Sequence, residues 1–184
     1  MNSGVDQLQI YLLSKMSALE LVRDAQLKLG ISPDQMKQIA ASLSDLDQVS
    51  HPARRYEALV GPPIAQRQLG PDDTSEPFVG SIERRYRLPL WPHVDFVVHE
   101  HPAGYAWGEE FKQAHDVRPP VDYAAVKPWD WAKDFLLRSA DAEEIVDRWT
   151  DYHETRLRFG GTTFQARFDL GLLQSWERIP PVQQ

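Results

Sequence analysis

The chain has 184 residues and a formal charge of −7, and its hydrophobic fraction of 42% is that of an ordinary globular protein. It contains no cysteine, which excludes disulfide scaffolds, thiolate metal sites and cysteine nucleophiles. The acidic balance argues against nucleic-acid binding and against attraction to an anionic membrane. No apolar run is long enough to span a bilayer, and the N-terminus lacks the pattern of a signal peptide. We therefore expect a cytoplasmic protein that binds neither nucleic acid nor membrane.

Residues 5–29 are predicted to form one long amphipathic helix. Apolar residues recur there every three or four positions, Lys15 interrupts the stripe, and Gly30 suits the left-handed position that ends many helices. The stripe is wide enough to be buried against another chain, which makes Leu12 and Leu19 candidate interface residues. Burial against the chain's own sheet would give the same pattern.

A second helix is predicted from Pro33 to Asp47. Ser32 is a suitable N-cap, and Gln35 stands at capping-box spacing from it. Because the junction with the first helix is short, the two helices should form an antiparallel hairpin. The junction also resembles the turn of a helix-turn-helix, but Lys37 is the only basic residue of the second helix, which argues against DNA contact.

Residues 61–77 are rich in proline and glycine and have little apolar periodicity. They are predicted to link a helical hairpin, residues 1–60, to an α+β domain, residues 78–184. The alternative is that all three parts form one compact unit.

After the linker the hydrophobic period changes to two, which predicts strands over 82–88 and 93–98. These strands should pair as an antiparallel hairpin. Glu83 and Arg85 alternate with the apolar residues of the first strand, so they are expected on its solvent face.

A second hairpin is predicted around Gly160-Gly161, with Leu157 facing Phe164 across the two-residue turn. Two helices are expected between the hairpins, one beginning near Pro128 and one at Asp141. The predicted fold class is therefore α+β: an N-terminal helical hairpin followed by a mainly antiparallel sheet with two helices packed on one face.

The histidines of the second strand are the strongest chemical motif. If the strand is regular, His99 and His101 point to the same side of the sheet. With a carboxylate as third ligand, for which Glu109 is the first choice beside Asp95 and Glu110, they would form a site for zinc, iron or manganese. The alternative is a row of polar side chains on the solvent face of an antiparallel sheet.

Tryptophan is unusually frequent, with six residues in the chain. Trp91 lies between prolines, and Trp129 and Trp131 cannot share one helix face because they are two residues apart. Exposed rigid aromatics are typical anchors of protein interfaces, so these three residues are candidate interface residues. Ordinary core packing is the alternative.

Several well-known catalytic motifs are absent from the sequence, including the phosphate-binding loop, the dinucleotide fingerprint and the nucleophile elbow. We therefore predict a non-catalytic protein-interaction module without a cofactor: an accessory subunit, an adaptor or an acidic neutralising partner. It would bind another protein, or a second copy of itself, through its N-terminal helices and its exposed aromatics. The alternative is a small metal- or ligand-dependent enzyme that uses His99 and His101.

Overall fold

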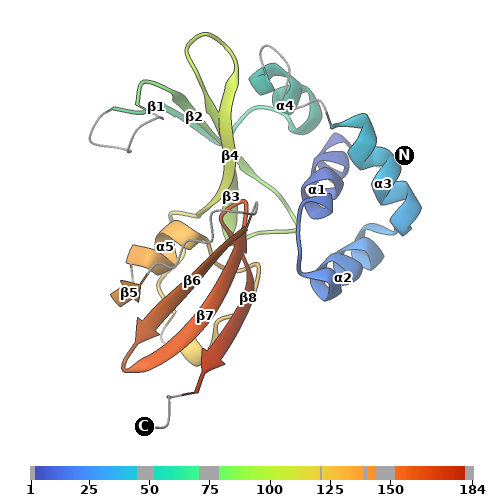
Figure 1. Cartoon of the computed structure of the whole chain (residues 1–184). Helices are drawn as coiled ribbons and strands as arrows, with labels where there is room; N and C mark the ends of the chain where they lie inside the picture. The colour runs from blue at the N-terminus through green and yellow to red at the C-terminus, as the bar shows by residue number, and fades with distance from the viewer. Residues whose placement is uncertain are drawn as a thin grey trace. The chain divides into compact units, whose positions relative to one another are not determined.

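The computed structural model describes residues 3–44, 52–70, 79–120, 122–138, 141–143 and 152–180. The chain divides into two compact units, and neither is continuous in sequence. The first comprises Met1–Leu90 with Phe96–Glu110, and the second comprises Trp91–Asp95 with Phe111–Gln184. The N-terminal helices thus share a unit with the first sheet, and the division between units does not fall in residues 61–77 (Figure 1).

The single helix predicted over residues 5–29 is wrong, because the structure has two helices there. Helix α1 spans Gly4–Ser14 and helix α2 spans Leu19–Leu29. At the end of α1 the Ser14 hydroxyl donates a 2.6 Å hydrogen bond to the carbonyl of Tyr11. Serine side chains compete in this way with the helical backbone pattern, and neither a glycine nor a proline marks the break.

Helix α3 spans Pro33–Ser42, and its predicted start is confirmed. The Ser32 hydroxyl accepts from the Gln35 amide at 3.2 Å, and the Gln35 side chain accepts from the Ser32 amide at 2.8 Å. Gly30 adopts the predicted left-handed conformation at the end of α2, with φ 65°. The predicted end at residue 47 lies outside the described residues, and α3 itself ends five residues earlier.

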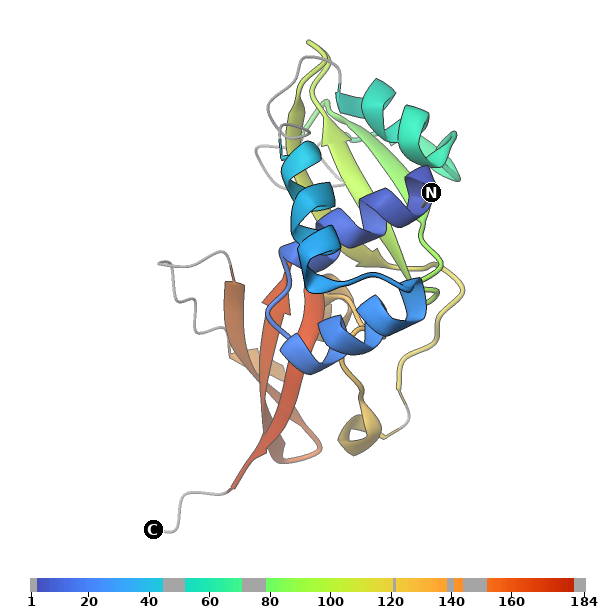
Figure 2. The ribbon, with the colours of Figure 1, turned by 90° about the vertical axis from the view of Figure 1, so that its right-hand side faces the viewer.

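A further helix, α4, spans Pro52–Val60. Together with α1 it belongs to the unit that contains the first sheet, and Figure 2 shows α1 crossing one face of that sheet. Six consecutive residues of α1, from Leu8 to Leu13, are buried, so this helix is covered almost all round. The Gln9 side chain anchors it by accepting a 2.7 Å hydrogen bond from the Leu90 amide.

The first sheet has four strands in the order β1-β2-β3-β4. These strands are β1 Ala65–Gln68, β2 Ile82–Arg87, β3 Val94–Glu100 and β4 Ala106–Gln113. The predicted neighbours β2 and β3 are adjacent. Part of the predicted linker is therefore a strand: β1 pairs antiparallel with β2, and Arg67 lies opposite Glu83.

The second sheet has the order β5-β6-β7-β8, and all its strands pair antiparallel. They are β5 Asp141–Glu143, β6 Tyr152–Phe159, β7 Thr162–Asp169 and β8 Leu172–Ile179. The predicted hairpin is confirmed, because Leu157 faces Phe164 and Phe159 faces Thr162. Gly160 and Gly161 supply the positive φ values, 52° and 81°, that a two-residue turn needs.

The segment before β5 contains a short 3-10 helix, η2 Tyr123–Ala125, and helix α5, Lys133–Arg138. Helix α5 begins at Lys133, five residues after Pro128, near which the predicted helix begins. Where a second helix was expected to begin, at Asp141, the structure has strand β5, and the rest of that prediction lies outside the described residues. The core of this unit consists of Val126, Leu136, Leu157, Phe159, Phe164, Ala166, Phe168 and Leu173.

Among the described helices, none has the length and apolar character needed to cross a membrane.

Candidate functional site

The histidine string, residues 93–101, contains the extended strand β3, as predicted, but the side chains of that strand do not face solvent. His93, just before the strand, is exposed, and His101, just after it, is half-buried. All seven residues of β3 are buried, and His99 is 1% exposed. His99 Nε2 lies 2.8 Å from Oε1 of Glu110, whose side chain is 34% exposed. A carboxylate on one ring nitrogen fixes the orientation of an imidazole, which is the arrangement of many acid–base histidines.

Two charged residues of β2, Glu83 and Arg85, are also buried, so their predicted place on a solvent face is wrong, whereas Arg87 at the end of the strand is exposed. Glu83 is 1% exposed and Arg85 is 7% exposed. Arg85 Nε lies 2.8 Å from Glu83 Oε1, and Arg67 Nε lies 3.3 Å from the same oxygen. Period-two alternation identifies the two faces of a strand but does not say which of them is covered. The opposite charges are buried as neighbours, which offsets the loss of hydration.

These ion pairs share the face of the sheet that carries His99. Arg84 Nε lies 2.8 Å from Glu100 Oε2, which places the even-numbered residues of β2 and β3 on one face. Glu83, Arg85 and His99 therefore lie on the other. Glu83, Arg85 and His99, which the sequence predicts on a solvent-facing surface, are buried polar residues instead.

His101 makes local contacts at the end of β3. Its Nδ1 accepts a 3.0 Å hydrogen bond from the Ala103 amide, and its ring stacks on Tyr105 with centroids 4.4 Å apart. Two backbone bonds close the same loop, from the His101 amide to the Tyr105 carbonyl and from the Gly104 amide to the His101 carbonyl. The imidazole of His101 is thus held by the loop that follows it.

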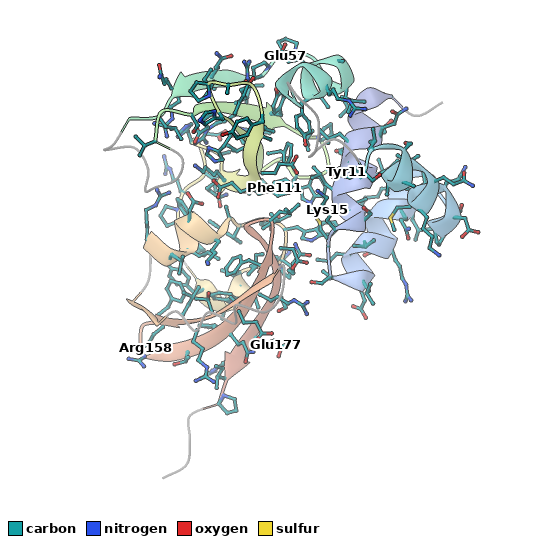
Figure 3. The ribbon with its side chains drawn as sticks, turned by 45° about the horizontal axis from the view of Figure 1, so that its top comes forward. Tyr11, Lys15, Glu57, Phe111, Arg158 and Glu177 are labelled. Atoms are coloured by element: carbon teal, nitrogen blue, oxygen red, sulfur yellow. The ribbon has the colours of Figure 1, made fainter. Side chains whose placement is uncertain are left out.

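Glu109 contacts neither histidine and has its own set of partners. The Tyr56 hydroxyl donates to its Oε1, and Lys15 Nζ lies 3.6 Å from its Oε2. Lys15 also lies over the ring of Tyr11, 4.3 Å from the centroid, one turn earlier on α1 (Figure 3). Glu109 and Glu110 are consecutive strand residues, so their side chains point to opposite faces.

The three candidate ligands His99, His101 and Glu109 therefore make three separate sets of contacts. Within the described residues, no group of three or more histidine, aspartate or glutamate side chains is arranged to hold a metal ion. The role of Glu110 as the partner of His99 became apparent only from the pairing of β3 with β4. From the sequence alone, Glu110 is named only as an alternative to Glu109.

Two of the predicted interface residues lie inside the protein. Leu12 and Trp91 are both 0% exposed. The Trp91 ring packs edge-on against Phe111 at 5.0 Å and against Trp129 at 5.8 Å between centroids. Neither Leu12 nor Trp91 presents atoms to a partner in this structure.

Trp129 and Trp131 are half-buried beside the start of β8. Their backbones hydrogen-bond to Leu173, from the Trp129 amide to the Leu173 carbonyl and from the Leu173 amide to the Trp131 carbonyl. The Trp129 indole donates a 3.2 Å bond to Gln174, and the Trp131 ring stacks on Phe135. Both residues thus help to hold their segment against the sheet.

The fifth predicted interface residue, Leu19, lies on the surface of α2. Its exposure is 67%, and Leu27 on the same helix reaches 79%. The opposite side of α2 is buried through Val22, Ala25 and Gln26. Leu27 carried no special signal in the sequence, because a single helix over residues 5–29 placed it among many apolar positions.

Comparison with protein-family models, curated proteins and solved structures found no match to this chain.

Proposed function

We propose that this chain is a non-catalytic, cytoplasmic adaptor or accessory protein that docks on a basic partner protein through helix α2. The observation that carries the proposal is the exposure of Leu19 and Leu27, 67% and 79%, on a helix whose other side is already buried. Single exposed apolar residues are common on protein surfaces, and what distinguishes Leu19 and Leu27 is their alignment along one side of the helix.

Leu19, Arg23 and Leu27 are spaced at four-residue intervals, which aligns them along one side of the helix. The two leucines are about 12 Å apart along the axis at 1.5 Å per residue. An amphipathic helix that binds in a groove presents anchors in this way. We call Leu19, Arg23 and Leu27 the α2 stripe.

The charge of the chain indicates the kind of partner. A protein of charge −7 is attracted to a basic surface, and such attraction speeds association and selects the partner. The helix itself carries Glu20 and Asp24 against Arg23 and Lys28, so it adds no net charge at the contact. The expected partner surface is thus an apolar groove for two leucines within a basic protein.

The proposal is tested by placing a photo-crosslinking amino acid at Arg23 of the full chain, in cells that produce it. The crosslinked protein is identified, purified and titrated with the wild type and with a Leu19→Ser/Leu27→Ser variant. Each leucine contributes about 1.5–3 kcal/mol when fully buried, so the double variant should bind at least tenfold more weakly. The association rate should fall as salt is added.

The matched control is a Gln38→Ser/Ala41→Ser variant, because both residues are exposed on the neighbouring helix α3. It should bind like the wild type, and both double variants should unfold at the wild-type temperature. The proposal is overturned if nothing crosslinks at position 23 or if the partner binds the leucine variant normally. A dimer of the chain that depends on the same leucines would assign the α2 stripe to a second copy and would also overturn it.

A further inference from the structure

The second unit contains a groove between η2, the β6–β7 turn and the end of β8. Its volume is about 380 Å³, within the range of pockets that hold small molecules. It is lined by Asp122, Tyr123, Ala124, Phe159, Gly160, Thr162, Phe164 and Arg178. None of these residues belongs to the histidine string or to the α2 stripe.

The base of the groove is aromatic. Tyr123 stacks on Phe159 with ring centroids 3.5 Å apart, and Phe164 stacks on Trp176 at 4.7 Å. Phe159 meets both Phe164 and Trp176 at centroid distances of 6.3 and 5.8 Å. Rings packed on one another in this way present a fixed apolar surface to a planar ligand.

The wall formed by η2 is held in place by two polar contacts. The Trp176 indole donates a 2.8 Å hydrogen bond to the Tyr123 carbonyl, and Asp122 Oδ1 accepts a 2.8 Å bond from the Ala124 amide. Both contacts join groups of the protein itself, so the groove has its shape before any ligand arrives. The contact with Ala124 also uses one oxygen of Asp122, which leaves that carboxylate less able to accept from a ligand.

Arg178 supplies the positive charge at the groove. It lies directly opposite Phe164 in the β7–β8 register, so the two side chains share one face of the sheet. The residue is exposed, and its side chain forms no ion pair or hydrogen bond among the described residues. A guanidinium beside an aromatic floor suits a planar group that ends in a carboxylate, since guanidinium binds carboxylates with two parallel hydrogen bonds.

From this geometry we infer that the groove binds a small planar aromatic carboxylate of one or two rings. The ring lies against the aromatic residues that line the groove, Tyr123, Phe159 and Phe164, and the carboxylate meets Arg178. Thr162, at the first position of β7, closes the end of the groove beside the turn.

The test uses the full chain and three probes of one ring system: indole-3-acetate, indole and tryptamine. Binding is measured by calorimetry and by the amide shifts of Gly160 and Thr162 in two-dimensional NMR. Indole-3-acetate should bind saturably and more tightly than neutral indole, and tryptamine should bind most weakly. Arg178→Gln should weaken the acetate about tenfold and leave indole nearly unchanged.

Arg158→Gln is the matched control. Arg158 is also exposed, lies on the same sheet (Figure 3) and faces Thr163, so its side chain is on the opposite face from Arg178. It should bind the acetate like the wild type. Thr162→Phe, which places a ring in the groove, should abolish the binding of both indole and the acetate.

Three outcomes would overturn the inference. No saturable shift at Gly160 and Thr162 would mean that the groove does not take this ligand class. Equal affinity of Arg178→Gln and the wild type for indole-3-acetate would remove the role of the guanidinium. Tighter binding of tryptamine than of indole-3-acetate would assign the selectivity to Asp122 and to a cationic ligand.

Discussion

At the scale of single residues, two neighbouring tyrosines show how burial and hydrogen bonding determine the state of the same group. The rings of Tyr56 and Tyr86 lie 6.3 Å apart, and both residues are almost completely buried. The Tyr56 hydroxyl donates to Glu109, whereas the Tyr86 hydroxyl has no hydrogen-bond partner among the described residues. Burial raises the pKa of Tyr86 to about 12, with smaller contributions from the nearby charges of Arg84, Glu57 and Glu100.

Removing each hydroxyl should therefore have a different effect on the free energy of unfolding near neutral pH. Tyr56→Phe should lower the free energy of unfolding by about 1–3 kcal/mol, because the Glu109 carboxylate loses a donor in a buried place. Tyr86→Phe should be neutral or slightly stabilising, because it removes a polar atom that makes no bond. Urea unfolding of both variants at pH 7 measures the difference, and a larger loss in Tyr86→Phe would contradict the assignment.

The raised pKa of Tyr86 also predicts a loss of stability in alkali. The unfolded residue ionises near its ordinary pKa of 10.0, whereas the folded residue keeps its proton until about pH 12. Stability is complete below pH 10 and falls as the pH rises toward 12, by at most about 3 kcal/mol for two pKa units. Unfolding measured from pH 9 to pH 12 should show this loss in the wild type, beyond that of Tyr86→Phe. Parallel curves for the two proteins would contradict the prediction.

At the scale of elements, a close backbone approach at Gly4 joins α1 to α4. A Cβ on Gly4 would clash with the carbonyl oxygen of Leu59, so only a glycine allows the two helices to meet there. The contact links the first residue of α1 to the last turn of α4, and Gly4 and Leu59 are 55 positions apart in sequence. The fold of the helical part thus depends on a position without a side chain.

Gly4→Ala should destabilise the protein by about 1–3 kcal/mol, the usual range for forcing extra atoms into a packed contact. Alanine is otherwise the better helix former, so an isolated α1 would be stabilised by the same change. Thermal unfolding followed by circular dichroism measures the effect. A melting temperature equal to or above that of the wild type would show that the helices separate there without loss.

Those elements that depend on neighbouring residues were predicted from the sequence, and those that depend on distant contacts were not. The capping box of α3 and the Gly160-Gly161 turn are set by a few adjacent residues, and both were predicted correctly. Strand β1 exists only because β2 lies beside it, so residues 65–68 carried no pattern of their own. The burial of Glu83, Arg85 and His99 likewise follows from what covers their face of the sheet. The contact of His99 has the same origin, because its partner Glu110 lies on the neighbouring strand β4.

At the scale of the whole molecule, the two compact units exchange short segments of chain. Strand β3 contributes its first two residues, Val94 and Asp95, to the second unit and the rest to the first. Strand β4 changes unit after Glu110. No single cut of the chain therefore separates one unit from the other. The helices are also tied to the first sheet, because Tyr56 meets the Phe96 ring at 5.7 Å and bonds to Glu109.

A fragment of residues 78–184, the α+β domain predicted from sequence, should therefore not fold alone. It lacks α1 and α4. Phe96 would therefore lose its contact with the Tyr56 ring, and Glu109 would lose both the Tyr56 hydroxyl and the Lys15 ammonium group. It also lacks β1, so Glu83 would lose the guanidinium of Arg67.

Near-ultraviolet circular dichroism and amide NMR of the purified fragment should show little fixed packing. Mixing with a fragment of residues 1–77 should restore both signals, because the missing contacts all come from that part of the chain. A cooperative thermal transition and dispersed amide signals for 78–184 alone would show that the helices are an independent attachment to a self-sufficient sheet.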